Sequence, residues 1–258
     1  MADLSFLGNA TSYLTVPTST DLNFGTGDFT IEWRQYQTDS NPYPRIFQIG
    51  FYDETNVISI GASIEGGTFY YWRNGIFYNV TTLDSSQYKN QWVHFAIVRN
   101  SGTTQVYMNG TSLLFNLADT FDYTSTDDLT IGNELVKDNI SSFGGYMEYF
   151  VWYKGYAKYT ENFVVPTGIP PVISSTMVLL TAAGSYGTLG PTVVNTNVGT
   201  GEPTPPPPPP PPPTPTITIQ RMFTSLYTNN AQVYYKSNSL ASCGVGTVRN
   251  SRMKARRT

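Results

Sequence analysis

Nine consecutive prolines, at residues 205–213, constrain this chain of 258 residues more than any other feature. Proline has no N–H donor and a fixed φ, so such a run cannot enter a helix or a sheet. It predicts a polyproline II linker over residues 203–215 that spans roughly 40 Å, at about 3.1 Å per residue. The linker separates a domain of residues 1–182, which is followed by a flexible lead-in at 183–202, from a C-terminal segment at 216–258.

Charge divides the chain at the same linker. The formal net charge is −3 at pH 7, with 15 Lys and Arg against 18 Asp and Glu. The C-terminal segment holds seven of the basic residues and no acidic residue, so the rest of the chain has a net charge of −10. Five basic residues fall in the last ten positions, and they are Arg249, Arg252, Lys254, Arg256 and Arg257.

We expect the basic C-terminal segment at 216–258 to anchor the chain in an assembly through these five basic residues. We call this C-terminal segment the basic segment. The strand-like, aromatic first part of this segment favours docking onto an acidic protein surface, such as another copy of the chain. Two alternatives stay open. The segment neutralises nucleic-acid phosphates in weak, salt-sensitive binding, or it is a solvated end.

Residues 1–182 carry the pattern of an all-β domain. Short runs rich in β-branched and aromatic residues recur, with Gly, Asn, Asp and Ser between them. Asn74-Gly75 and Asn109-Gly110 each lie between such runs and predict type I′ hairpin turns, whose central residues need positive φ. No helical period persists, so we expect a two-sheet antiparallel sandwich or jelly roll.

Several stretches, in order along the chain, resemble one family. They are LSFLGNATSYLTVPTSTDLNFGTGDFTIEWRQY (4–36), WVHFAIVRNSGTTQVYMNG (92–110), LTIGN (129–133), GGYMEYFVWYKGYAKYTENFVVPT (144–167) and MVLLTAAGS (177–185). Together they resemble the laminin-G-like members of the concanavalin A-like lectin/glucanase superfamily. The resemblance implies a jelly roll.

The resemblance leaves function open, because this superfamily includes lectins, glycan hydrolases, adhesion modules and structural parts of phage and large-virus particles. The chain also departs from the family at residues 148–151. It has Glu-Tyr-Phe-Val where the family often has Asp-Glu-(Val/Phe)-Arg, so a common polar contact is missing.

Composition and spacing predict no catalytic residues. The chain has one His and one Cys, which excludes a multi-histidine metal centre and an internal disulfide. A retaining glycosidase needs two carboxylates about 5 Å apart, and the Glu-x-Asp-x-x-Glu string of the superfamily's hydrolases is absent. Asp28 and Glu32 are spaced i, i+4, but we expect surface or turn roles for them. We expect His94 to be half-buried and hydrogen-bonded within the sandwich.

No metal or other cofactor is predicted. Asp127 and Asp128 precede the LTIGN strand and Asp138 follows it, and loop carboxylates of this kind can hold calcium. Paired Asp residues are common in solvated loops, which is the interpretation we favour.

Six residues are candidates for carbohydrate binding: Tyr70, Trp72, Arg73 and Asn74 at one hairpin tip, with Tyr43 and Tyr52. Aromatic faces stack on sugar rings, while amide and charged groups bind the hydroxyls. The alternative is that alternate members of Phe69–Trp72 face the core, because one side of every strand must be buried.

The start of the chain, MADLSFLGNATSYL, lacks the basic and apolar regions of a signal peptide. No apolar run approaches the length of about 18 residues that predicts a membrane span. We therefore expect a non-enzymatic structural or attachment component of a virion, such as a minor capsid or fibre-like protein. The alternatives are a free carbohydrate-binding module for host or algal glycans and, third, a divergent glycan hydrolase.

Overall fold

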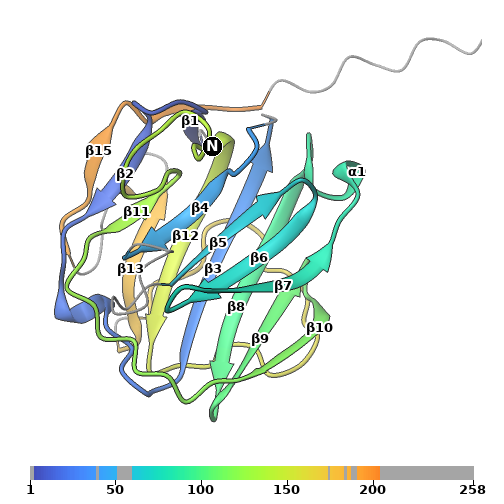
Figure 1. Cartoon of the computed structure of the whole chain (residues 1–258), viewed down its shortest axis with the longest axis vertical. Helices are drawn as coiled ribbons and strands as arrows, with labels where there is room; N and C mark the ends of the chain where they lie inside the picture. The colour runs from blue at the N-terminus through green and yellow to red at the C-terminus, as the bar shows by residue number, and fades with distance from the viewer. Residues whose placement is uncertain are drawn as a thin grey trace, which may run out of the picture. The chain divides into compact units, whose positions relative to one another are not determined.

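A computed structural model describes residues 3–38, 41–50, 60–173, 175–182, 185–186 and 191–203 (Figure 1). The chain divides into two units, Met1–Pro208 and Pro209–Thr258, and every described residue belongs to the first. Tyr52 and the proline linker after Pro203 lie outside the described residues. So do Cys243 and the basic residues Arg249, Arg252, Lys254, Arg256 and Arg257.

The described strands form two sheets, which confirms the all-β prediction (Figure 1). The larger sheet contains β1 (Asp3–Leu7), β3 (Phe29–Gln37), β8 (Trp92–Asn100), β9 (Thr103–Met108), β10 (Thr111–Ala118), β12 (Gly144–Lys154), β13 (Met177–Ala182), β14 (Ser185–Tyr186) and β16 (Gly199–Gly201). The smaller sheet contains β2 (Tyr13–Val16), β4 (Arg45–Ile49), β5 (Ile60–Glu65), β6 (Thr68–Arg73), β7 (Ile76–Thr82), β11 (Leu129–Ile131) and β15 (Val194–Thr196). Two short helices, η1 (Thr20–Leu22) and α1 (Ser85–Tyr88), lie between strands.

All strand pairs within the sheets are antiparallel, as in a jelly roll. The larger sheet runs β10-β9-β8-β3-β12-β1-β16, with β13 on another part of β12 and β14 beside β13. The smaller sheet runs β15-β2-β11-β4-β5-β6-β7. Several neighbours in this order, such as β1 with β16 and β2 with β15, come from distant parts of the chain, so segments far apart in sequence lie side by side.

The core lies between the two sheets and is rich in aromatic rings. Trp33 of β3 lies 5.5 Å from Phe95 in its own sheet and 6.3 Å from Phe69 in the facing sheet, measured between ring centroids. Because successive side chains of a strand point to opposite faces, Glu32 and Arg34 project from the outer face of the larger sheet. The outer faces are therefore where polar side chains gather.

Both Asn-Gly pairs form the turns that the sequence predicts. Asn74 and Gly75 have φ of 47° and 71°, and Asn109 and Gly110 have φ of 48° and 77°. Gly110 has a second role, because a Cβ there would lie 2.0 Å from the carbonyl oxygen of Phe163. The segment that follows β12 and contains Phe163, residues 155–163, therefore packs directly on this turn, and we call it the crossover.

The prediction of a flexible lead-in at 183–202 is wrong for the second half of this range. Residues 191–203 include β15, which pairs with β2 of the smaller sheet, and β16, which pairs with β1 of the larger sheet. Between them the Asn195 side chain bonds both the N–H and the carbonyl of Val198, at 2.8 and 2.9 Å. The Gly, Thr and Asn content does not indicate these strands, because partner strands far away in the sequence supply the hydrogen bonds that order these residues.

Candidate functional site

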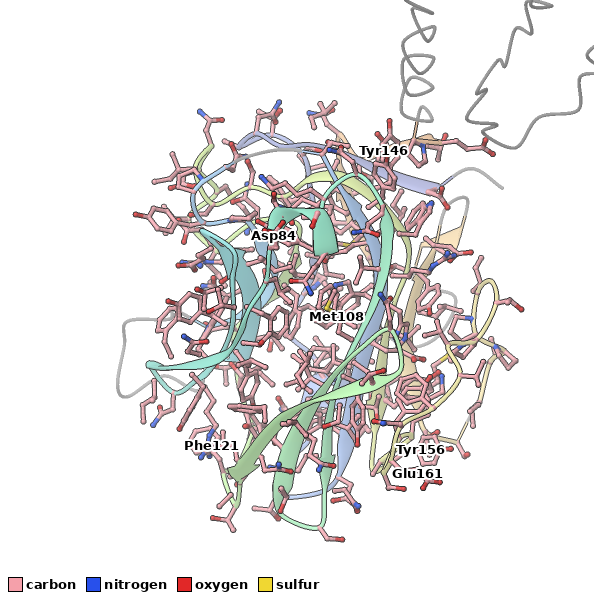
Figure 2. The ribbon with its side chains drawn as sticks, turned by 90° about the vertical axis from the view of Figure 1, so that its right-hand side faces the viewer. Asp84, Met108, Phe121, Tyr146, Tyr156 and Glu161 are labelled. Atoms are coloured by element: carbon pink, nitrogen blue, oxygen red, sulfur yellow. The ribbon has the colours of Figure 1, made fainter. Side chains whose placement is uncertain are left out.

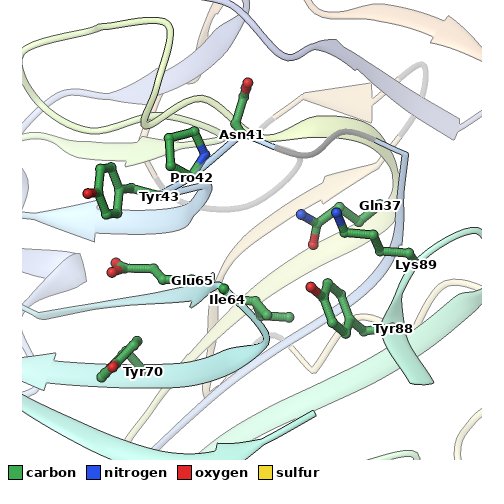
Figure 3. Close-up of a pocket in the computed structure, with 10 residues that line it drawn as sticks. Gln37, Asn41, Pro42, Tyr43, Ile64, Glu65, Tyr70, Tyr88 and Lys89 are labelled. Atoms are coloured by element: carbon green, nitrogen blue, oxygen red, sulfur yellow. The ribbon is translucent and has the colours of Figure 1, made fainter. Parts of the chain in front are cut away.

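A cleft of about 400 Å³ opens at one end of the sandwich, where the β5–β6 hairpin turns (Figure 3). Its walls come from the end of β3, the loop before β4, the β5–β6 hairpin and the end of α1. The lining includes Gln37, Asn41, Tyr43, Glu65, Tyr70 and Lys89. We name it the tyrosine cleft.

Tight local structures bring these walls together. Gly66 and Gly67 turn the β5–β6 hairpin with φ of 55° and 88°, and the Gly67 carbonyl accepts the Leu83 N–H. Asp84 begins α1 with a capping box, accepting from the Ser86 N–H at 2.9 Å. The helix then ends beside the cleft.

The loop before β4 presents Tyr43. The Tyr43 N–H donates to the Ile140 carbonyl at 3.1 Å, and the Asn41 amide donates to the Ser142 carbonyl at 2.8 Å. These bonds hold the loop while the Tyr43 side chain stays 45% exposed. Figure 3 shows Tyr43 and Tyr70 on either side of Glu65.

Glu65 is the charged group between the two tyrosines. Its Oε1 accepts from the Ser63 hydroxyl at 2.7 Å and from the Arg45 guanidinium. Arg45 is itself buried, with its guanidinium 5.0 Å from the centre of the Trp72 ring. Both bonds go to Oε1, so Oε2 remains available to accept from a ligand hydroxyl, and Arg45 balances the charge.

Trp72 is not the exposed stacking surface that the sequence suggested. It is 0% exposed and lies on the outer face of the smaller sheet, across Gly61, where a Cβ would come within 2.0 Å of its ring. Phe77 stacks on it at 5.2 Å. The alternative prediction was that alternate members of Phe69–Trp72 face the core. It is confirmed for Phe69 and Tyr71, which belong to the core, whereas Trp72 is buried on the outer face of the sheet. Its role is to support Arg45.

Two other predicted residues also lie away from the cleft. Arg73 donates to Asp119 Oδ1 at 2.9 Å and to the Ala118 carbonyl at 3.2 Å. Asn74 is a turn residue. The predicted residues that the structure describes therefore divide into two groups. Tyr43 and Tyr70 line the cleft, and Trp72, Arg73 and Asn74 serve the fold.

Sequence reasoning missed Glu65, Asn41 and Lys89 as lining residues. The Gly66-Gly67 pair was a usable signal for a hairpin turn that would bring Glu65 to a tip. The approach of Asn41 had no local signal, because its anchor at Ser142 is 101 positions away.

The outer face of the larger sheet holds a second polar cluster, centred on Glu32. The expected surface or turn role of Glu32 is wrong, because the residue is 0% exposed. Its Oε1 accepts from the Tyr153 hydroxyl at 3.0 Å and from Lys158 Nζ. Its Oε2 accepts from the Tyr159 hydroxyl at 2.7 Å and lies 3.2 Å from His94 Nε2. Although burial alone would raise the pKa of Glu32, hydrogen bonding to His94 and the Lys158 ammonium lower it to about 2.

This cluster has the residue types of an acid–base site, but the chain covers it. Lys158 and Tyr159 belong to the crossover after β12, and Phe163 stacks on Tyr159 at 3.5 Å. The cluster thus holds the crossover on the sheet. The predicted hydrogen bonding of His94 is confirmed, and the residue is buried rather than half-buried.

The remaining carboxylates singled out in the sequence serve loops. Asp28, Asp128 and Asp138 accept the N–H groups of Ser101, Thr18 and Ser141, at 2.8, 2.8 and 2.6 Å. Within the described part of the chain, no three His, Cys, Asp or Glu residues are grouped so that they could hold a metal ion. None of the helices described there has the length and apolarity to span a membrane.

A family model described as the concanavalin A-like lectin/glucanases superfamily matches residues 7–158, more than half of the chain. The chain belongs to this superfamily. No curated protein matches it.

Among solved structures, a pentraxin shares the fold, and two further structures match less well. The native heptameric SAP-like pentraxin from Limulus polyphemus matches with a TM-score of 0.52 and 16% identity, over 78% of this chain and 94% of the pentraxin. Domains LG4-5 of the mouse laminin alpha1 chain match with a TM-score of 0.46 and 14% identity, over 63% of this chain and 45% of theirs. Domain 4 of AbnA, an arabinanase from Geobacillus stearothermophilus in complex with arabinotriose, matches with a TM-score of 0.44 and 19% identity, over 58% and 70%.

Proposed function

We propose that this chain is a non-catalytic carbohydrate-binding protein and that the tyrosine cleft is its binding site. The observation that carries the proposal is the meeting of Tyr43 and Tyr70 on either side of Glu65 (Figure 3). Sugar rings offer apolar faces to aromatic side chains and hydroxyl donors to a carboxylate oxygen. Membership of a lectin-containing superfamily supports the same function.

The ligand is a neutral glycan. The charge of Glu65 is balanced by Arg45, and the ammonium group of Lys89 also lines the cleft, so the Glu65 carboxylate accepts from hydroxyl groups in a lining with no excess negative charge. Asn41 and Gln37 add amide groups to the lining. The volume of about 400 Å³ falls within the range of about 300–1,000 Å³ typical of small-molecule sites.

The cleft lacks the arrangement that glycoside hydrolysis needs. Retaining and inverting enzymes place two carboxylates roughly 5 to 9 Å apart around the bond that breaks. Glu65 is the one carboxylate among the described residues that line this cleft. We therefore expect no release of reducing sugar in hydrolysis assays on β-glucans.

A glycan array probed with the full chain tests the binding function. We expect binding to neutral oligosaccharides, and an affinity loss of about tenfold or more in Tyr70→Ala, worth about 1.4 kcal/mol. Tyr156→Ala is the matched control, because Figure 2 shows Tyr156 at the end of the sandwich opposite Asp84, the cap of α1 beside the cleft. Absence of glycan binding, or equal losses in both variants, would overturn the proposal.

We further propose that the chain is a component of a large assembly, a virion, with the basic segment as its anchor. The observation that favours this role is the charge division, with seven basic and no acidic residues after the linker and a net charge of −10 before it. The partners are other proteins of the assembly or further copies of the chain. Deletion of residues 216–258 should abolish incorporation into particles, measured by mass spectrometry of purified particles, and leave glycan binding intact. Normal incorporation of the truncated chain would contradict the role.

A further inference from the structure

The outer face of β6 and β7 continues from the tyrosine cleft. Tyr78 of β7 packs against the core, so the side chains before and after it, Phe77 and Asn79, point outward. Asn79 pairs directly with Tyr70 of β6, which lines the cleft. β7 is the last strand in the hydrogen-bonded order of this sheet (Figure 1). Tyr70, Phe77 and Asn79 therefore form a strip of outer face that begins at the cleft, and we name it the outer strip.

Phe77 presents a fixed aromatic ring in this strip. Its side chain is 37% exposed, although one face of the ring stacks on the buried Trp72, with ring centroids 5.2 Å apart. The accessible part of the Phe77 ring therefore lies away from Trp72. Tyr70 contacts the same ring at 6.1 Å, with the two planes at 75°. A ring that is already held by its neighbours loses little conformational freedom when a ligand packs on it.

Asn79 adds hydrogen-bonding groups beside this ring. Its side chain is exposed, and its strand position lies directly across from Tyr70. An amide both donates to and accepts from hydroxyl groups, which surround the rim of a sugar ring. The outer strip thus has the same two kinds of group as the tyrosine cleft, an aromatic surface and polar side chains next to it.

The geometry of the two rings indicates the size of the ligand. Because the planes of Tyr70 and Phe77 lie at 75° to each other, one flat sugar ring cannot stack on both. The separation of 6.1 Å between their centroids is close to the length of one sugar unit in a chain. A ligand that contacts both rings therefore uses different sugar units for them.

We propose that the outer strip is a second subsite next to the tyrosine cleft, and that the ligand is a linear neutral oligosaccharide. Its chain runs from Glu65 in the cleft over Tyr70 to Phe77 and Asn79. The inference rests on the carbohydrate-binding function proposed above and names the class of glycan, an extended chain rather than a single terminal sugar.

The dependence of affinity on chain length tests the second subsite. Linear oligosaccharides of glucose, xylose, mannose, galactose and arabinose, each as a series from dimer to hexamer, are titrated into the full chain by calorimetry. In a series that binds, we expect the affinity to rise about tenfold from the dimer to the longer members, as the chain reaches Phe77. Equal affinity for all lengths would overturn the proposal.

Substitution of Phe77 assigns the gain in affinity to this ring. Phe77→Leu keeps an apolar side chain on Trp72 but removes the flat ring, so it should abolish the gain of the longer oligosaccharides and leave the affinity for the dimer within about twofold. Phe77→Tyr keeps the ring and should restore the gain. Asn79→Ala should lower the affinity for the longer members about threefold.

The matched control is Val164→Ala, which also truncates an exposed apolar side chain. Val164 is 93% exposed and follows Phe163, whose ring packs with Tyr159 against the larger sheet. This variant should bind every length as the unchanged chain does. Thermal unfolding of each variant shows that it is folded at the temperature of the titration.

The outcomes separate this inference from the proposed function. If Tyr70→Ala weakens binding but length and Phe77→Leu have no effect, the tyrosine cleft stands and the outer strip is wrong. An equal loss for dimer and hexamer in Phe77→Leu would mean that Phe77 acts on the cleft itself, which also overturns the second subsite. Failure of Phe77→Tyr to restore the gain would contradict stacking on this ring. Absence of binding in every series contradicts both proposals.

Discussion

The two outer faces of the sandwich differ in how many hydrogen-bond donors surround a carboxylate. On the larger sheet, Glu32 is 0% exposed, and four side chains from three segments surround its two oxygens. On the smaller sheet, Glu65 receives both of its donors on one oxygen and lies in a cleft between partly exposed tyrosines. Aromatic residues are abundant on both faces, so composition does not distinguish them.

The difference lies in how fully the protein satisfies each acceptor. A carboxylate whose lone pairs are all used by buried donors stabilises the fold and has nothing left for a ligand. A carboxylate with an unused oxygen beside accessible aromatic rings can bind hydroxyl groups. The outer face of the larger sheet is thus structural around Glu32, and the outer face of the smaller sheet carries the proposed binding site.

The largest expected effect is a loss of unfolding free energy when Glu32, on the outer face of the larger sheet, is replaced. Glu32→Gln keeps the size of the side chain but leaves Lys158 and His94 facing an amide, and breaking a buried charge pair costs about 3–5 kcal/mol. Urea unfolding at neutral pH should show this loss, while Glu161→Gln, at an exposed position, should change stability by less than about 0.5 kcal/mol. A loss of under about 1 kcal/mol in Glu32→Gln would show that the cluster does not hold the crossover.

Low pH should reduce the stability that the cluster around Glu32 contributes to the fold. The pKa of Glu32 is lowered from 4.5 to about 2 in the folded chain, so its contribution is fully present above pH 4.5 and is lost as the pH falls towards 2. A shift of this size corresponds to about 3 kcal/mol. Unfolding free energies measured across this range should fall less steeply in Glu32→Gln than in the unchanged chain. Parallel curves would contradict the ionised state of Glu32.

An intermediate loss of stability is expected when the packing of Trp72 beneath Arg45 is changed. Gly61→Ala would place a Cβ within 2.0 Å of the Trp72 ring and displace the surface on which Arg45 rests. Overpacking of this kind costs about 1–3 kcal/mol. Thermal unfolding should show the loss together with weaker glycan binding, because Arg45 orients Glu65. Unchanged glycan binding in a destabilised variant would show that this support is not needed.

The smallest effect in free energy is expected at Glu65 itself. Glu65→Gln keeps one acceptor oxygen but loses the charge that orders Arg45, so glycan affinity should fall about fivefold, or roughly 1 kcal/mol. Isothermal titration with a glycan found on the array measures this. Tyr43→Ala should lower affinity at least as much, and an affinity unchanged by either substitution would place the site elsewhere.

Much of the fold was predictable because its determinants are local. Alternating strands and the Asn74-Gly75 and Asn109-Gly110 turns specify hairpins through neighbouring residues, and the ordered family motifs supply the topology. The lead-in at 191–203 was not predictable, because β15 and β16 depend on partners at the other end of the chain.

The site was only partly predictable for the same reason. The aromatic residues Tyr43 and Tyr70 could be singled out by type. Nothing local indicated the burial of Glu32, since Lys158 and Tyr159 are 126 and 127 positions away. The burial of Trp72 also depends on a cross-strand partner, Gly61, and on a turn that brings β5 and β6 together.

The most direct test of the account is one titration series on the full chain with an array-selected neutral oligosaccharide. Tyr70→Ala should lose about tenfold or more in affinity with its unfolding free energy within about 1 kcal/mol of the unchanged chain. Glu32→Gln, measured where it is still folded, should keep its affinity and lose stability. Full affinity in Tyr70→Ala, or no glycan binding by the unchanged chain, would contradict the assignment of the tyrosine cleft as the binding site.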